Sequence, residues 1–329
     1  MRHLFDLDRA CRARASLAGG ALIGPGAVFG SAAAVSWGIG DFCGGLLGRW
    51  SSVLTSLLVA QTLPTLPLLL ILAASGETQP SAEHMIWAIL AGASGVTGLA
   101  FFYFALARGT MGVVAPLAAV IGLGIPVLVG FAGGESLSSL RLLGIACALV
   151  AVVLISVPTR PADNAAGRKL RTDISDLPLV GLAGLGFAGF FIFMDRATEA
   201  GATWWPLATV RVVGTVLVVV AAIAIIATRT APTLRARASD ALGVRRLRES
   251  GRTWSVLAPL LVITATADLG GNVFFVMANR TDALAIAVAL SSLYPVVTTL
   301  LAAIFLRERL SRLQIVGVIL ATASVPLLR

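Results

Sequence analysis

The strongest constraint on the fold is the stretch between Asp282 and Arg307, which contains no charged residue and is mostly apolar. A helix of about 24 residues rises roughly 36 Å, which exceeds the bilayer hydrocarbon core of about 30 Å. The stretch therefore predicts a membrane-spanning helix. A charged turn follows at 307–309, and the apolar sequence from Leu313 onward predicts a second helix that returns across the membrane.

Composition places the whole chain in the same environment. Of its 329 residues, 57% are hydrophobic and only 12% are charged, and the mean hydropathy is +0.93. So few charges cannot cover a soluble globule of this size. The formal net charge is +9, but lysine and arginine lie mostly in short loops between apolar runs. Such a pattern orients membrane proteins, and it argues against a nucleic-acid partner.

Ten apolar runs follow one another, so we expect an all-α integral membrane protein with about ten transmembrane helices. The runs lie at 27–47, 53–73, 85–107, 112–132, 140–157, 177–197, 204–227, 254–277, 283–306 and 312–328. A polar, proline-containing segment divides them five and five, and its composition is typical of a linker. The expected order is an N-terminal tail, a five-helix repeat, this linker and a second five-helix repeat, at residues 1–26, 27–157, 158–176 and 177–329.

The two halves of the sequence resemble each other. Residues 113–150 are a looser copy of the final hairpin, in which Pro126 corresponds to Pro295. Gln61 in the second run aligns with Arg211 in the seventh at an offset of 150, and the third run matches the eighth at about 171. Five helices per half is an odd number, so the second half must enter from the opposite side. This predicts an inverted repeat, which in secondary transporters has its substrate site near the midplane.

Three stretches carry a family resemblance: SSLYPVVTTLLAAIFLRERLSRLQIVGVIL in the final hairpin, DLGGNVFFVMANR before it, and the step Trp37-Gly38. Together with the duplication, they resemble the EamA-type family of the drug/metabolite transporter superfamily, over nearly all of the chain from about residue 27. The resemblance implies a ten-helix transporter of small organic solutes, made of two inverted five-helix repeats, with both termini in the cytoplasm. One departure is Gln61, which stands where the second half has Arg211.

Loop charge and family resemblance imply opposite orientations. Loops after the odd-numbered runs hold 16 lysines and arginines and the other side holds 8, which with Arg211 inside a run accounts for all 25. The positive-inside rule would place the side with 16 charges in the cytoplasm and both termini outside. We therefore expect a multi-pass protein of the cell (inner) membrane and leave the orientation of its termini open.

Ionisable groups inside a span cost about 2.5 to 3.5 kcal/mol on insertion scales, so each is a candidate for substrate or proton binding. Asp268 lies mid-span near the polar Asn272, although it could be a structural carboxylate paired with an arginine. Asp41 lies among glycines whose GxxxG spacing tight helix packing would also explain. Arg211 could bind an anionic group, neutralise either aspartate or extend to the interface. Gln61 would then supply a neutral hydrogen-bonding group on the opposite wall.

Aromatic and proline residues give a second set of candidates. Those for the wall of an apolar cavity are Trp37, Tyr103, Phe274 and Tyr294. Lipid contact or core packing would also account for each of them. The candidate hinges are Pro126 and Pro295, because a proline within a span frees a backbone carbonyl and can bend the helix.

Enzyme signatures are missing from the sequence. The only histidines are His3 and His84, and the three cysteines have no metal or redox spacing, so no metal and no cofactor is expected. The sequence predicts a secondary transporter, monomeric or homodimeric in membrane lipid, that moves a metabolite, amino acid or drug-like compound by alternating access. Protons are the candidate coupling ion, at Asp268 and Asp41. Two alternatives are a lipid or lipid-linked flippase of the same fold and an intramembrane enzyme, whose paired acidic motifs the sequence lacks.

Overall fold

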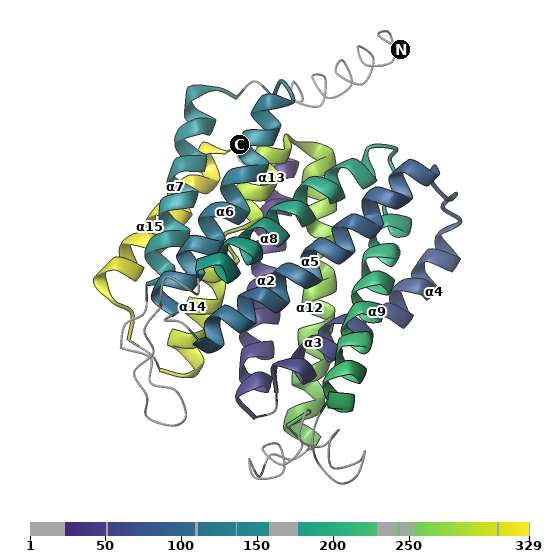
Figure 1. Cartoon of the computed structure of the whole chain (residues 1–329). Helices are drawn as coiled ribbons and strands as arrows, with labels where there is room; N and C mark the ends of the chain where they lie inside the picture. Colours follow the sequence, from purple (N-terminus) through teal and green to yellow (C-terminus); the bar gives the residue numbers. More distant parts are fainter. Residues whose placement is uncertain are drawn as a thin grey trace.

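A computed structural model describes residues 24–50, 52–108, 111–135, 137–157, 177–228, 242–243, 251, 254–307 and 309–328. Within these residues the chain is helical and contains no strand (Figure 1). The helices are α2 (Pro25–Trp50), α3 (Val53–Thr62), α4 (Thr65–Ser75), α5 (Ala82–Arg108), α6 (Met111–Ala132), α7 (Ser139–Ser156), α8 (Leu177–Thr198), α9 (Trp204–Thr228), α12 (Trp254–Thr281), α13 (Leu284–Ser291), α14 (Tyr294–Phe305) and α15 (Arg312–Leu327).

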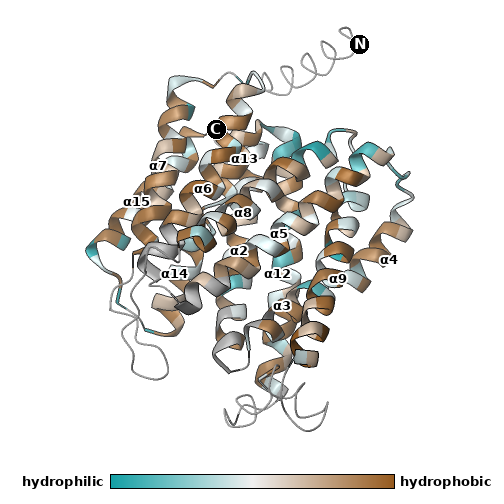
Figure 2. Ribbon diagram, viewed as in Figure 1, coloured by the Kyte–Doolittle hydropathy of each residue, from teal (hydrophilic) through white to brown (hydrophobic). Residues whose placement is uncertain are grey.

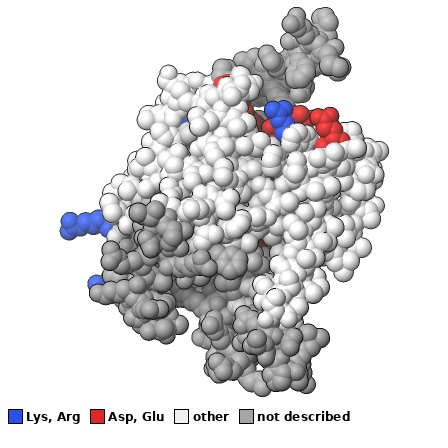
Figure 3. Space-filling view, in the orientation of Figure 1, with Lys and Arg blue, Asp and Glu red and all other residues white. Residues whose placement is uncertain are grey.

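The helices have the length and the surface of membrane spans. Seven stretches of the described chain are long and apolar enough to cross a bilayer, and α6 and α15 add shorter apolar segments. Large apolar side chains such as Leu66, Leu128 and Ile304 are exposed. The helices carry mostly hydrophobic residues (Figure 2), and the described part of the face seen in Figure 3 carries few charges. Such a surface needs lipid around it. The prediction of an all-α, multi-pass membrane protein is confirmed, whereas the count of ten spans stays a prediction.

Two of the expected spans are interrupted. The run at 53–73 forms α3 and α4, separated by a turn at Leu63 and Pro64, and the run at 283–306 forms α13 and α14. Pro64 has no N–H for the carbonyl four residues earlier, and its ring would clash with that carbonyl. Pro295 lies in the first turn of α14, where a proline starts a helix without losing a bond. These two spans therefore differ from the continuous helices expected.

The helices pair symmetrically across the two halves of the chain. α2 packs against α12 as α5 packs against α8, and α6 contacts α8 as α13 and α14 contact α2. α7 pairs with α15, and α3 and α4 pair with α9. If each of the first five apolar runs is exchanged with its counterpart among the second five, the same set of helix pairs results. This is the pairing that an inverted repeat requires, and it places the interface between the halves at the centre of the molecule.

Candidate substrate cavity

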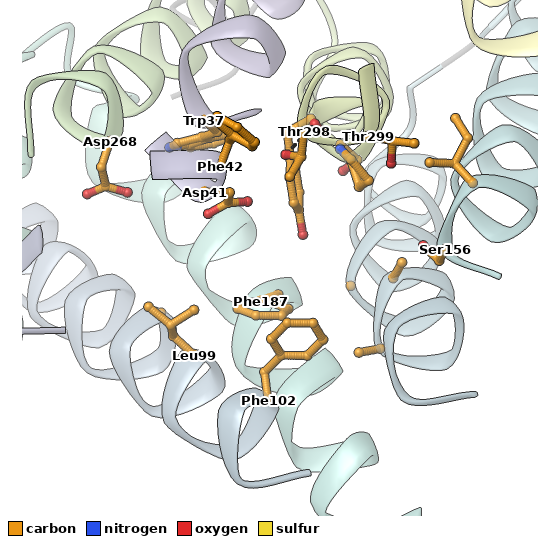
Figure 4. Close-up of a pocket in the computed structure, with 18 of the residues that line it drawn as sticks. Trp37, Asp41, Phe42, Leu99, Phe102, Ser156, Phe187, Asp268, Thr298 and Thr299 are labelled. Carbon is orange, nitrogen blue, oxygen red and sulfur yellow. Dashed lines mark hydrogen bonds between the residues drawn. The ribbon is translucent and has the colours of Figure 1, made fainter. Parts of the chain in front are cut away.

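A cavity of about 1070 Å³ lies between the two halves. It is lined by α2, α5 and α6 from the first half and by α8, α12 and α14 from the second, among other segments. Asp41, Asp268 and Trp37 lie on one side of it, with Phe102 and Phe187 on the other (Figure 4). This volume is slightly above the usual range for sites that hold small organic molecules, about 300 to 1,000 Å³.

Asp268 and Arg211 form an ion pair in the cavity wall. Nη2 of Arg211 lies 2.5 Å from Oδ2 of Asp268, and the two side chains are 2% and 32% exposed. Nη1 donates to the backbone oxygen of Ala60 and to Oε1 of Gln61, each at 3.3 Å. Ala60 is four residues before Pro64, so the arginine bonds the carbonyl that this proline leaves without a helical donor. Pro64 was the sequence signal for this contact.

The pairing narrows the roles predicted for these residues. Arg211 balances Asp268 rather than Asp41, and its guanidinium is buried and engaged by protein groups. It is therefore poorly placed to bind an anionic ligand. Gln61 lies beside its repeat counterpart on the same wall and not opposite it. Asn272 lines the cavity with only 7% of its surface exposed, and it adds an amide to this wall.

Asp41 lies on α2 with its side chain exposed in the cavity (Figure 4). Within the described part of the chain, no hydrogen bond or ion pair joins it to another residue. It is close enough to Asp268 and Tyr294 to interact with both electrostatically. Because Arg211 balances Asp268, the ionised Asp41 carboxylate is an unbalanced negative charge at the centre of the cavity.

Aromatic rings surround this carboxylate. Trp37 lies one helical turn before Asp41 on the same face of α2. Its ring centroid lies 6.1 Å from those of Phe191 and Phe275 and 6.4 Å from that of Tyr294. Trp37, Phe191 and Tyr294 all line the cavity. A cluster of aromatic rings therefore lies one helical turn from Asp41, and three of its members line the same cavity.

The remaining candidates fall in different places. Phe274 packs against the main apolar core and is not among the residues that line the cavity. Tyr103 lies on α5, but its side chain is outside the described part of the structure. Pro295 lines the cavity directly after the break between α13 and α14, whereas Pro126 is buried within the continuous helix α6. A bend at Pro295 would therefore change the cavity directly.

Hydroxyl groups that the sequence reasoning missed also line the cavity. They belong to Ser156, Ser292, Thr298 and Thr299. Thr298 donates from Oγ1 to the backbone oxygen of Gly38 at 3.1 Å, which ties α14 to α2. Ser292, Thr298 and Thr299 lie close to Tyr294-Pro295 in the sequence. Polar residues near an intramembrane proline were therefore the sequence signal for these groups.

Glu77 joins the two halves at one end of the molecule. It lies between α4 and α5, and its carboxylate accepts backbone N–H bonds from Thr203, Trp204 and Trp205 at 2.8 to 3.2 Å. The indole Nε1 of Trp205 donates to the backbone oxygen of Glu77 at 3.0 Å. A carboxylate at this position satisfies the free N–H groups of the first turn of α9 and favours its dipole.

Glu135 makes an equivalent contact from the connection between α6 and α7. Its carboxylate accepts backbone N–H bonds from Leu284 and Ala285 at 2.8 and 3.3 Å, at the start of α13. All residues of α13 are buried. Burial raises the pKa of Glu135 above its ordinary value, and the two backbone hydrogen bonds oppose that shift. Neither glutamate was predicted to contribute to a site.

Further contacts hold the same end together. Arg141, in the first turn of α7, pairs with Asp282 at 3.5 Å. Asp282 also lies against Gly26 at the start of α2, so closely that a Cβ atom on this glycine would overlap it. Asn279 donates to Asp195 at 2.9 Å between α12 and α8. Polar contacts therefore join the start of α7 to the connection between α12 and α13, and α12 to α8.

The cavity extends toward the opposite end of the helices. Its lining includes Leu46 near the end of α2, Val157 just after α7, and Arg307 and Arg309 between α14 and α15. The described lining residues thus run from the middle of the helices to one end. Among the described residues, the end joined by Glu77 and Glu135 contributes none of them.

The chemistry of the lining is that of a binding site. It offers a carboxylate, an ion pair, amides, hydroxyls and aromatic rings. Among the described residues, no group of three or more histidine, cysteine, aspartate or glutamate side chains could hold a metal ion. The arrangement suits non-covalent recognition of a solute that has a polar and an apolar part.

Fold and cavity together define a multi-pass helical membrane protein whose two similar halves enclose a central, partly polar cavity. The sequence matches the EamA-like transporter family over residues 24–157 and again over 177–329. Since the two matches cover most of the chain, the protein belongs to this family, within the drug/metabolite transporter superfamily. The family indicates a membrane transporter, and the double match supports the two-repeat architecture.

Comparison with solved structures gives information on the fold alone. Among solved structures, 27 chains match this one. One of them, described only as a crystal structure of a protein, has a TM-score of 0.63 and 14% sequence identity, and the match covers 92% of this chain and 97% of that chain. At this identity the likeness shows the fold alone. No curated protein matches the sequence.

Proposed function

We propose that the protein is a secondary transporter that moves a small organic solute across the cell membrane by alternating access between its two halves. The observation that carries this proposal is the one-ended cavity at the interface of the halves. Its lining reaches one end of the helices, and the other end is joined by contacts of Glu77, Glu135 and Arg141. A cavity with one open and one joined end supports this mechanism, since alternating access requires a state of this kind.

Opening the joined end requires Glu77 and Glu135 to release the first turns of α9 and α13. Glutamine at position 135 imitates a protonated carboxylate and accepts backbone N–H bonds more weakly. In Glu135→Gln we expect amide hydrogen exchange at Leu284 and Ala285 to accelerate by about tenfold. The exposed Glu199→Gln serves as the matched control and should leave this exchange unchanged. Unchanged exchange in Glu135→Gln would show that this carboxylate does not hold the end closed.

We further propose that transport is coupled to protons at the cavity carboxylates. Asp41 can gain and lose a proton without breaking an ion pair, whereas protonation of Asp268 would release Arg211. Asp41 is therefore the better of the two predicted proton sites, with Asp268 as its electrostatic neighbour.

The deciding experiment uses the full chain, purified and reconstituted into vesicles. A screen of solute classes by thermal shift identifies a ligand through its stabilisation of the folded protein. Counterflow and pH-driven uptake of that ligand, radiolabelled, then test transport. Saturable uptake driven by a pH gradient and lost in Asp41→Asn supports both proposals. A ligand that binds but never crosses contradicts the transporter. Uptake that is unaffected by the double variant Asp41→Asn, Asp268→Asn contradicts proton coupling.

A further inference from the structure

The charge balance of the cavity centre restricts the solute. Among the described residues, three side chains with a formal charge lie there, namely Asp41, Asp268 and Arg211. The guanidinium of Arg211 is bonded to Asp268 and to two groups of α3, and the side chain is 2% exposed. Asp41 is exposed in the cavity and has no cationic partner among the described residues. A solute that reaches this point meets a net negative charge.

The aromatic rings around Asp41 favour the same class of ligand. Trp37 and Tyr294 line the cavity with Asp41, and the carboxylate is close enough to Tyr294 to interact with it electrostatically. Aromatic faces attract organic cations through the ring quadrupole, most strongly for tryptophan and where water is excluded. A carboxylate beside such rings can bind an ammonium group, and the rings bind the carbon atoms attached to it.

The opposite wall gives the apolar half of the site. Figure 4 shows Leu99, Phe102 and Phe187 across the cavity from Asp41. Phe102 and Phe187 are in edge contact, with ring centroids 5.7 Å apart. Among the described residues, this wall carries no charged side chain in the cavity. It therefore suits an aromatic or aliphatic group and provides no cation for a carboxylate.

We propose that the transported solute is a hydrophobic organic cation, an amine or a quaternary ammonium compound without a carboxylate, bound with its cationic group at Asp41. This rests on the proposed transport function and names its substrate class. An anion or an amino acid would need a free positive group at the cavity centre, and Arg211 does not supply one.

Two arginines at the mouth of the cavity have the opposite charge. Arg307 and Arg309 line the open end, and both are exposed to solvent. Salt screens exposed charges over about 8 to 10 Å, so they have little effect at the cavity centre. Their effect falls on entry of the solute, and added salt should speed the entry of a cation.

The test compares four soluble compounds that share a phenyl ring and a short chain but differ in charge. They are phenethylamine, 2-phenylethanol, phenylalanine and 3-phenylpropionate. Binding to the purified full chain is measured by calorimetry and by the shift of the unfolding temperature. We expect phenethylamine to bind at least about tenfold more tightly than any of the other three.

Variants connect this preference to the carboxylate. In Asp41→Asn, phenethylamine should bind about as weakly as 2-phenylethanol, and Asp41→Glu should retain the preference for the amine. Among the described residues no hydrogen bond or ion pair joins Asp41 to another residue, so we expect both variants to fold normally. Glu199→Gln removes an acidic group outside the cavity and should leave all four affinities unchanged.

The outcomes separate this inference from the transport proposal. Tightest binding of 3-phenylpropionate or phenylalanine, or amine binding that survives in Asp41→Asn, overturns the cation assignment even where vesicles show saturable transport. Binding of phenethylamine that depends on Asp41 but gives no counterflow in vesicles supports the cation site and contradicts the transporter. Binding and counterflow that are both lost in Asp41→Asn support the two together.

Discussion

Two helix crossings with the same position in the repeats have different chemistry. α2 crosses α12, and α8 crosses α5. At the offset of 150, Asp41 in the first repeat corresponds to Phe191 in the second. At the offset of 172, which aligns Arg108 with Arg280, Asp268 corresponds to Val96. One crossing therefore presents two carboxylates to the cavity where the other presents a phenyl ring and a valine.

The comparison shows how a symmetric scaffold makes an asymmetric site. Both crossings depend on small residues, with Gly98 against Gly186 in one and Ser36 against Gly270 in the other, and these are equivalent pairs under the same offsets. The close contacts thus lie at equivalent positions, and the side chains that face the cavity have diverged. One wall carries charge and the other is apolar, which is what the proposed amphipathic solute would need.

The largest expected effect comes from breaking the ion pair that only the polar crossing has. Asp268→Asn leaves the buried guanidinium of Arg211 without its counter-charge. Breaking a fully buried pair costs about 3 to 5 kcal/mol. Since the Asp268 side chain is 32% exposed, we expect a loss of roughly 2 to 3 kcal/mol of unfolding free energy in detergent.

A double variant tests whether charge is the cause. Arg211→Gln gives the second half the residue that Gln61 provides in the first. In the background of Asp268→Asn it removes the unpaired charge and should restore about half of the lost stability. A double variant no more stable than Asp268→Asn alone would mean that the pair contributes through shape and not through charge. Val96→Thr, at the equivalent site of the apolar crossing, is the control and should cost only about 1 kcal/mol.

The second prediction concerns the contacts that the two crossings share. A Cβ atom on Gly186 would overlap the backbone of Gly98, which cannot move without separating α5 from α8. A Cβ atom on Gly270 would lie 2.7 Å from Oγ of Ser36, a side chain that can rotate. We expect Gly186→Ala to cost about 2 kcal/mol and Gly270→Ala less than about 1 kcal/mol, measured as thermal unfolding in the same detergent.

The hydroxyl of Ser36 explains the remaining cost at Gly270. It donates to the backbone oxygen of Ala267 at 2.7 Å, and rotation would break that bond. The double variant Ser36→Ala, Gly270→Ala removes the overlap, because both residues at the crossing of α2 and α12 are then small. If Gly186→Ala and Gly270→Ala destabilise the protein equally, the expected difference between a backbone contact and a side-chain contact is wrong.

The sequence predicted the scaffold well because its signals are local and repeated. Apolar runs and the offset of 150 indicated the helices and the equivalence of Gln61 with Arg211. Two features depended on contacts between distant segments and could not be read in this way. The break at Pro64 matters because it frees a carbonyl for Arg211, and the role of Glu135 depends on the start of α13 lying beside it. A titratable residue in a loop has no periodic pattern from which such a neighbour could be inferred.

Three charged residues of the cavity wall could be named from the sequence, but their arrangement could not. Asp41, Asp268 and Arg211 stood out because charges inside spans are costly. Which aspartate pairs with the arginine depends on how α9 packs against α3 and on the rotation of α12, and neither is encoded in spacing along one helix. The same limit applies to Phe274, whose aromatic character suited a cavity wall but whose side of α12 faces the core.

The smallest expected effect separates function from stability at the polar crossing. Asp41 has no partner in the described structure, so Asp41→Asn should change the unfolding free energy by less than about 0.5 kcal/mol. At the equivalent position, Phe191 is 7% exposed and contacts Trp37, Phe190 and Phe275. Phe191→Leu should therefore cost about 1 kcal/mol. A stable Asp41→Asn protein that has lost binding would show that this carboxylate is retained for the solute, whereas a strongly destabilised one would mean that Asp41 contributes to helix packing, as its glycine neighbours first suggested.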